Sequence, residues 1–136
     1  MRTAELDAAF RATTYRVRAP EGLFELRIGG PNPAFDDFLR RQRVSCWGMV
    51  TAYNPGGVRC DEDNPLFQRR LQERVQALGW PWLASSIYSD TGEWPVEPGF
   101  LLLQVNEDEV CRLASEFSQL ACVCGDTGGV PRLIWV

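Results

Sequence analysis

Residues 46–52, CWGMVTA, form a segment with apolar residues in both of its alternating sets of side chains. Such a strand needs cover on both faces, so we expect it in the interior of a sheet. It stops at NPGG, residues 54–57, because proline has no N–H for strand pairing and glycine permits a sharp turn. Asn64 as N-cap, Pro65 in the first turn and Gly79 as the stop then predict a helix.

The rest of the chain adds strands and amphipathic helices around this segment. This segment is preceded by a predicted hairpin, TYRVR and LFELRIG, and a predicted helix, AFDDFLRRQR. It is followed, beyond the helix that begins at Asn64, by the predicted strands WLASSIY and FLLLQV, a helix opened by Asn106, and the predicted strands LACVC and RLIWV. From residue 46 the order is strand, helix, strand, strand, helix, strand, which is the split β-α-β repeat. We therefore expect an α+β fold, a ferredoxin-like sandwich with helices on one face and an added N-terminal hairpin and helix. The alternative is an open three-layer α/β sheet with a parallel centre.

Nothing in the sequence divides residues 1–136, so a single domain is expected. Prolines and glycines are spread along the chain without a linker or an internal repeat. The longest apolar stretches are about one strand long, far short of the roughly 20 residues that cross a bilayer, and the N-terminus lacks the apolar core of a signal peptide. We expect a cytoplasmic protein that contacts no membrane.

All 14 basic residues are arginine, and the chain has no histidine. Nucleophiles activated by imidazole, imidazole metal ligands and lysine Schiff bases are therefore excluded. Proton transfer near neutral pH would fall to carboxylates, thiols or tyrosines with shifted pKa values. The net charge of -4 is the wrong sign for gathering phosphates. We expect no nucleic acid partner, and no motif indicates a cofactor or a metal.

The five cysteines are an odd number in a chain without a secretion signal, which disfavours a disulfide framework. Cys122 and Cys124 share one face of a predicted strand, where small buried thiols are expected and a metal or redox site is the alternative. Cys60 lies in a polar loop, but no histidine is present to activate its thiol.

A polar loop flanked by Asn54 and Asn64 is the first candidate for a ligand site. It connects an interior strand to a helix N-terminus, a position where open sheets commonly bind ligands. Asp61, Glu62 and Asp63 lie in the same loop, where their charge would repel a phosphate. A capped connection without a ligand is the alternative.

The second candidate is WPVEPGF, in which Glu97 lies between two prolines and close after Trp94. Stiff flanks and an aromatic neighbour would hold the carboxylate in a partly dry place, which raises its pKa and suits it to proton transfer. A rigid hairpin connection that carries a surface glutamate is the alternative.

The chain also contains TYRV, FELRIG, WGMVTAYNP with DEDN before a helix, GEWPVEPGFLLLQV and a closing P-x-L-I-W. In this combination, over nearly its whole length, it resembles an uncharacterised bacterial family, domain of unknown function 3293. The family supplies no activity, so the resemblance implies no catalytic residue. It implies one common pattern that includes Thr51, Tyr53, Asn54, Asn64, Trp94, Pro95 and Glu97.

Two functions fit these observations. The first is a non-catalytic module that binds a small molecule or a protein, with a homodimer through a sheet edge or face as one such partnership, since five tryptophans offer contact area. The alternative is a small carboxylate-dependent enzyme with Glu97 as acid or base, aided by a divalent ion at Asp61 and Asp63. The enzyme requires the 54–64 loop and the Trp94–Glu97 segment to share a cleft.

Overall fold

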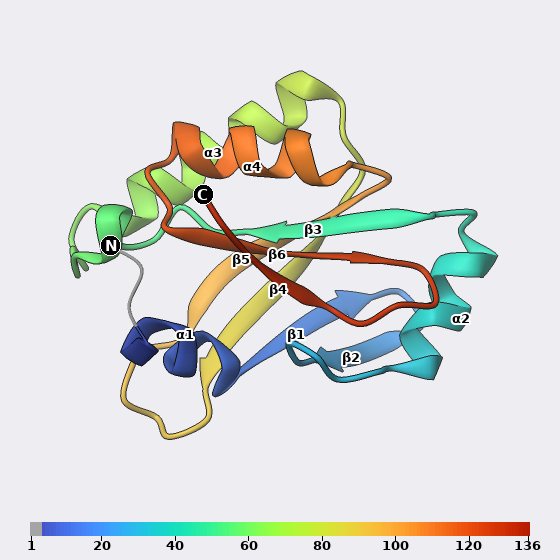
Figure 1. Cartoon of the computed structure of the whole chain (residues 1–136). Coiled ribbons are helices and arrows are strands. Elements are labelled where there is room, and N and C mark those ends of the chain that lie inside the picture. The colour runs from blue at the N-terminus through green and yellow to red at the C-terminus, as the bar shows by residue number, and fades with distance from the viewer. Residues whose placement is uncertain (1–3) are drawn as a thin grey trace.

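The structure is a computed structural model that describes residues 4–136, which form four α-helices and seven strands (Figure 1). In chain order they are α1 (Ala4–Arg11), β1 (Thr13–Ala19), β2 (Gly22–Leu26), α2 (Pro33–Arg41), β3 (Cys46–Val50), a 3-10 turn (Pro55–Gly57), α3 (Asn64–Leu78), β4 (Trp82–Ser89), β5 (Glu97–Leu103), α4 (Glu107–Glu116), β6 (Ala121–Asp126) and β7 (Arg132–Trp135).

The seven strands form one sheet in the order β2-β1-β4-β5-β3-β6-β7. Each neighbouring pair is antiparallel, which confirms the α+β class. The alternative with a parallel centre is wrong, because β5 lies between β3 and β4, the two strands that α3 connects. The CWGMV strand is interior, as predicted, with β5 on one side and β6 on the other.

Helices cover both faces of the sheet, whereas the sequence predicted helices on one face only. Val75 of α3 and Val110 of α4 belong to the core that β3 and β5 share on one side. On the other side, Phe35 and Phe38 of α2 pack in a core with Trp47 of β3. The apolar stripe of α2 was predicted correctly, but helical periodicity does not say which face of a sheet a stripe will meet.

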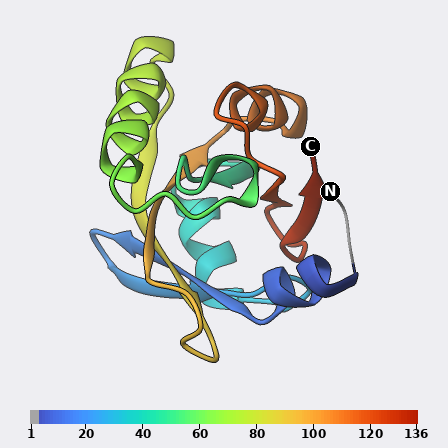
Figure 2. The same cartoon turned by 90° about the vertical axis from the view of Figure 1, so that its left-hand side faces the viewer.

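The sheet is curled, which brings its two edges together at one place. The backbone N–H of Gly29, just after β2, donates to the carbonyl of Pro131, just before β7, at 2.8 Å. Helix α2 lies at one end of this curl (Figure 1). Figure 2 views the molecule from the opposite end, where α1 and the loop after β3 lie in front and α2 lies behind. Within residues 4–136, no helix combines the length and the apolar character needed to cross a bilayer.

Candidate functional site

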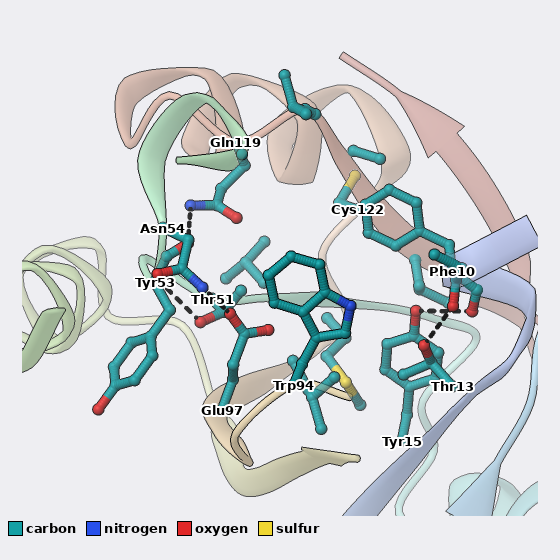
Figure 3. Close-up of a pocket in the computed structure, with 18 of the residues that line it drawn as sticks. Phe10, Thr13, Tyr15, Thr51, Tyr53, Asn54, Trp94, Glu97, Gln119 and Cys122 are labelled. Atoms are coloured by element: carbon teal, nitrogen blue, oxygen red, sulfur yellow. Dashed lines mark hydrogen bonds between the residues drawn. The ribbon is translucent and has the colours of Figure 1, made fainter. Parts of the chain in front are cut away.

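A recess of about 180 Å³ lies at the end of the curled sheet away from α2 (Figure 3). It is bounded by α1, β1, the end of β3 and its loop, the β4–β5 connection, and the starts of β6 and β7. Its apolar wall includes Phe10, Met49, Ile87, Leu120, Val123 and Leu133. Its polar side chains include Thr13, Tyr15, Thr51, Asn54, Glu97 and Gln119.

The structure brings the two predicted segments together at this recess. Thr51, Tyr53, Asn54, Trp94 and Glu97 all line it. The sixth predicted residue lies just behind: Asn64 lines an adjoining hollow of about 170 Å³ whose other lining residues are Tyr53, Asn54, Asp61, Pro95 and Glu97. The 54–64 loop and the Trp94–Glu97 segment therefore share one concave region.

Asn54 links the two segments directly. Its backbone adopts a left-handed conformation with φ of 52°, which asparagine tolerates better than most residues. Its side-chain Oδ1 accepts hydrogen bonds from the backbone N–H of Cys60 at 3.2 Å and from Asn64 Nδ2 at 2.8 Å. Because Oδ1 faces these donors, Nδ2 faces Glu97 and donates to Glu97 Oε1 at 2.9 Å. The orientation of the amide is thus fixed by a backbone donor.

Asn64 supports Asn54 from beneath and does not cap α3, so the N-cap prediction was wrong. The N-cap is Asp63, and Asn64 is the first helical residue, only 2% exposed. Its Oδ1 accepts from the backbone N–H of Asn54 at 2.8 Å and from Cys60 Sγ at 3.1 Å. A buried amide is retained where it satisfies otherwise unpaired donors, and here the donors lie across the loop and not in the first turn of the helix.

Glu97 is a half-buried carboxylate with few hydrogen-bond or ion-pair partners to offset the cost of its burial. Burial raises the pKa of Glu97, and the hydrogen bond from Asn54 offsets part of this rise. No arginine within residues 4–136 lies at ion-pair distance from it. Burial also raises the pKa of Tyr15, and the nearby negative charge of Glu97 adds to that effect. The predicted environment of Glu97, partly dry and beside Trp94, agrees with this geometry.

Replacing Glu97 with glutamine is expected to raise the melting temperature at about pH 8 and to leave it unchanged at about pH 4. A carboxyl whose pKa is higher in the folded state stabilises that state fully below its unfolded pKa, about 4.3, and this contribution is lost as the pH rises through the folded pKa. Glutamine keeps an acceptor for Asn54 and never ionises. The other titratable side chains that face this region, Tyr15 and Asp61, are present in both proteins.

Thermal unfolding followed by circular dichroism across this pH range measures the effect. Glu93→Gln is the matched control, because Glu93 is an exposed glutamate of the same segment. A change in melting temperature for Glu97→Gln that is the same at both ends of the pH range would contradict a raised Glu97 pKa.

Thr51 and Gln119 hold the loop in place. Thr51 Oγ1 donates to the carbonyl of Pro98 at 2.9 Å and accepts from the backbone N–H of Tyr53 at 3.1 Å. Gln119 Nε2 donates to the carbonyl of Tyr53 at 3.1 Å. In Figure 3 the Tyr53 ring points away from Trp94. Thr51 and the Tyr53 backbone therefore position the loop, and the Tyr53 ring contributes to the edge of the recess.

Sequence reasoning missed the wall of the recess that β1 and the α4–β6 connection provide. Thr13, Tyr15 and Gln119 all line it. The alternation in TTYRVRA indicates that Tyr15 faces inward, but it contains no signal for what Tyr15 faces. Gln119 follows α4 in an irregular connection and had no recognisable signal at all.

The acidic loop and the cysteines were the sequence's candidate ligands for a metal ion. Among residues 4–136, no group of three or more potential metal ligands is present. Asp61 is paired with Arg59 at 3.0 Å. Cys122 and Cys124 are both buried, as predicted, and hydrogen bonding to Cys124 together with burial raises the pKa of Cys122. A raised thiol pKa makes the thiolate, the reactive form, scarce.

Residues 50–122, more than half of the chain, match the family described as protein of unknown function (DUF3293). The chain belongs to this family. The matched region contains all six predicted site residues and the connections that carry them, whereas α1 and β1, which form the opposite wall of the recess, lie outside it. Neither a curated protein nor a solved structure matches the chain.

Proposed function

We propose that the protein is a binding module whose ligand, a small organic molecule, occupies the recess. The observation that carries this proposal is a single carboxylate, oriented by Asn54 and short of partners, at the side of a largely apolar hollow. Ligand sites typically combine apolar walls with a few placed polar groups and a perturbed pKa. Of the two kinds of partner that the sequence allowed, a small molecule fits this concave shape better than a protein surface does.

A matched pair of substitutions on α1 tests this proposal. Ala9 lines the recess, and its neighbour Ala8 is exposed and is not among the lining residues. Both sit in the same helix, so tryptophan at either position makes the same chemical change. A ligand found in a thermal-shift screen of metabolites is expected to bind Ala9→Trp at least about tenfold more weakly than wild type, and Ala8→Trp about as well. Equal binding to both variants, or a screen that yields no ligand, would count against the proposal.

A small carboxylate-dependent enzyme is the second candidate, and the raised pKa of Glu97 is the observation that favours it. Such a carboxyl can hold a proton closer to neutral pH and pass it to a bound molecule. Slow chemical conversion of a screened ligand, followed by NMR and lost in Glu97→Gln, would support the enzyme. Unchanged ligand after prolonged incubation favours the binding module.

We further propose a ferredoxin-like arrangement for the segment from β3 to β6, within a single domain. The strand order β4-β5-β3-β6 supports it, because each pair of strands joined through a helix is separated by one other strand. On this view α1, β1, β2 and α2 are additions that curl the sheet and supply the second wall of the recess.

A further inference from the structure

Two hydroxyl groups in the recess donate hydrogen bonds to main-chain carbonyls of α1. Thr13 Oγ1 donates to the carbonyl of Ala9 at 2.7 Å, and Tyr15 Oη donates to the carbonyl of Phe10 at 3.4 Å. Both carbonyls belong to the last turn of α1, so these bonds fasten α1 to β1. A hydroxyl has one proton and two lone pairs. With its proton directed to the Ala9 carbonyl, Thr13 Oγ1 offers lone pairs to a ligand, and Tyr15 Oη has the same direction of donation over a longer distance.

Two further groups also leave acceptors available. Gln119 Nε2 is committed to backbone carbonyls, and in Figure 3 its side-chain oxygen points away from Asn54. Glu97 Oε1 accepts from Asn54, and Oε2 has no hydrogen-bond partner among residues 4–136. These groups therefore present oxygen acceptors to the recess, and one of the acceptors is a carboxylate oxygen of Glu97.

Trp94 lies beside this carboxylate on the recess wall. It is 50% exposed and has an extended aromatic face, the type of surface that attracts a cation most strongly among side chains. An anionic ligand would meet Glu97, and among residues 4–136 no cationic side chain lies within ion-pair distance of Glu97 to offset the repulsion. An ammonium group would donate a charge-assisted hydrogen bond to Glu97 and make a favourable contact with the Trp94 ring.

The size of the recess limits the rest of the ligand. A cavity of about 150 Å³ accommodates a benzene ring, so the recess of about 180 Å³ has room for one ring or a branched alkyl group with a short chain. Met49, Ile87 and Leu133 provide the apolar contacts for this part. The carboxylate and the apolar wall therefore specify two ends of one compact molecule.

We propose, building on the small-molecule function above, that the recess selects a primary amine in its ammonium form, carried on an apolar body of about one aromatic ring. Glu97 receives the ammonium group and Trp94 covers it. Asn54 and Asn64 act as positioning residues, because they orient Glu97 without being the groups that meet the charge.

Three probes of nearly equal shape test the inference: 2-phenylethylamine, 2-phenylethanol and 3-phenylpropanoate. Binding is measured by calorimetry on wild type, Glu97→Gln and the control Glu93→Gln. The amine is expected to bind wild type and Glu93→Gln at least about tenfold more tightly than the alcohol does, and the anion least well. In Glu97→Gln the preference for the amine is expected to disappear while binding of the alcohol is retained, which also shows that the variant is folded.

Different outcomes separate this inference from the function on which it rests. Equal binding of amine and alcohol, blocked by Ala9→Trp, would overturn the charge selectivity and support a ligand site. Tightest binding of 3-phenylpropanoate would also overturn the selectivity. No binding of any probe at concentrations of about 10 mM would overturn the inferred ligand class, and the wider metabolite screen would then judge the site independently.

Discussion

Replacing Asn64 with alanine is expected to lower the free energy of unfolding by about 2 to 4 kcal/mol. The substitution removes the acceptor of the Asn54 backbone N–H and the donor to Asn54 Oδ1. Both bonds lie in a place where Asn64 is almost fully buried, so water cannot replace the lost partners without rearranging the loop. Urea unfolding at constant pH measures the change.

Asn106→Ala provides the matched comparison. Asn106 is an exposed asparagine that caps α4 in a capping box with Glu109, and losing such a cap costs about 1 kcal/mol. If Asn64→Ala costs no more than Asn106→Ala, the network between Asn64, Asn54 and Glu97 does not hold the loop. In addition, binding of any recess ligand is expected to weaken in Asn64→Ala and to remain unchanged in Asn106→Ala.

The second large effect is expected for Gly48→Ala, which should destabilise the protein by about 2 to 3 kcal/mol. A Cβ atom at this position of β3 would lie 2.3 Å from Cγ2 and 2.8 Å from Cγ1 of Val110. Val110 is fully buried in α4, and a β-branched side chain on a helix has one strongly preferred rotamer. The clash can therefore be relieved only by moving α4 away from the sheet.

A second substitution checks this cause. Val110→Ala leaves a cavity and is itself destabilising, but in combination with Gly48→Ala it makes room for the new methyl group. The loss in free energy of unfolding of the double variant is expected to be smaller than the sum of the two single losses by about 1 kcal/mol or more. Strictly additive effects would contradict the close packing of α4 on β3. Gly30→Ala, where the nearest atoms lie at 3.5 Å or beyond, is the control for replacing a glycine.

Local signals in the sequence predicted the elements well. The two-residue alternation of the N-terminal hairpin, the apolar character of β3 and the Asn106 cap each depend on neighbours within a few residues, and all three are present in the structure. The strand order does not follow from the element order alone, because the same order also fits an open α/β sheet with a parallel centre. The position of α2 was not predicted either, since it depends on how far the whole sheet curls.

The candidate site was likewise predicted only in part. Its two central segments were predicted because proline, glycine and asparagine mark the places where regular structure stops. The role of Asn64 was not predicted. The rule for helix ends describes local hydrogen bonds, whereas the hydrogen bonds of this side-chain amide reach across the loop to Asn54. Tyr15 and Gln119 join the recess only through contacts between segments far apart in the chain, which no short pattern encodes.

The indole N–H signals of the tryptophans test the recess most directly. Trp94 lines it, whereas Trp80 and Trp82 pack against the core beneath α3 and α4. In proton–nitrogen NMR spectra, with the Trp94 signal assigned through Trp94→Phe, a bound ligand is expected to move the Trp94 signal in proportion to its occupancy and to leave those of Trp80 and Trp82 in place. A ligand that moves the Trp80 and Trp82 signals while Trp94 stays unchanged would contradict binding in this recess.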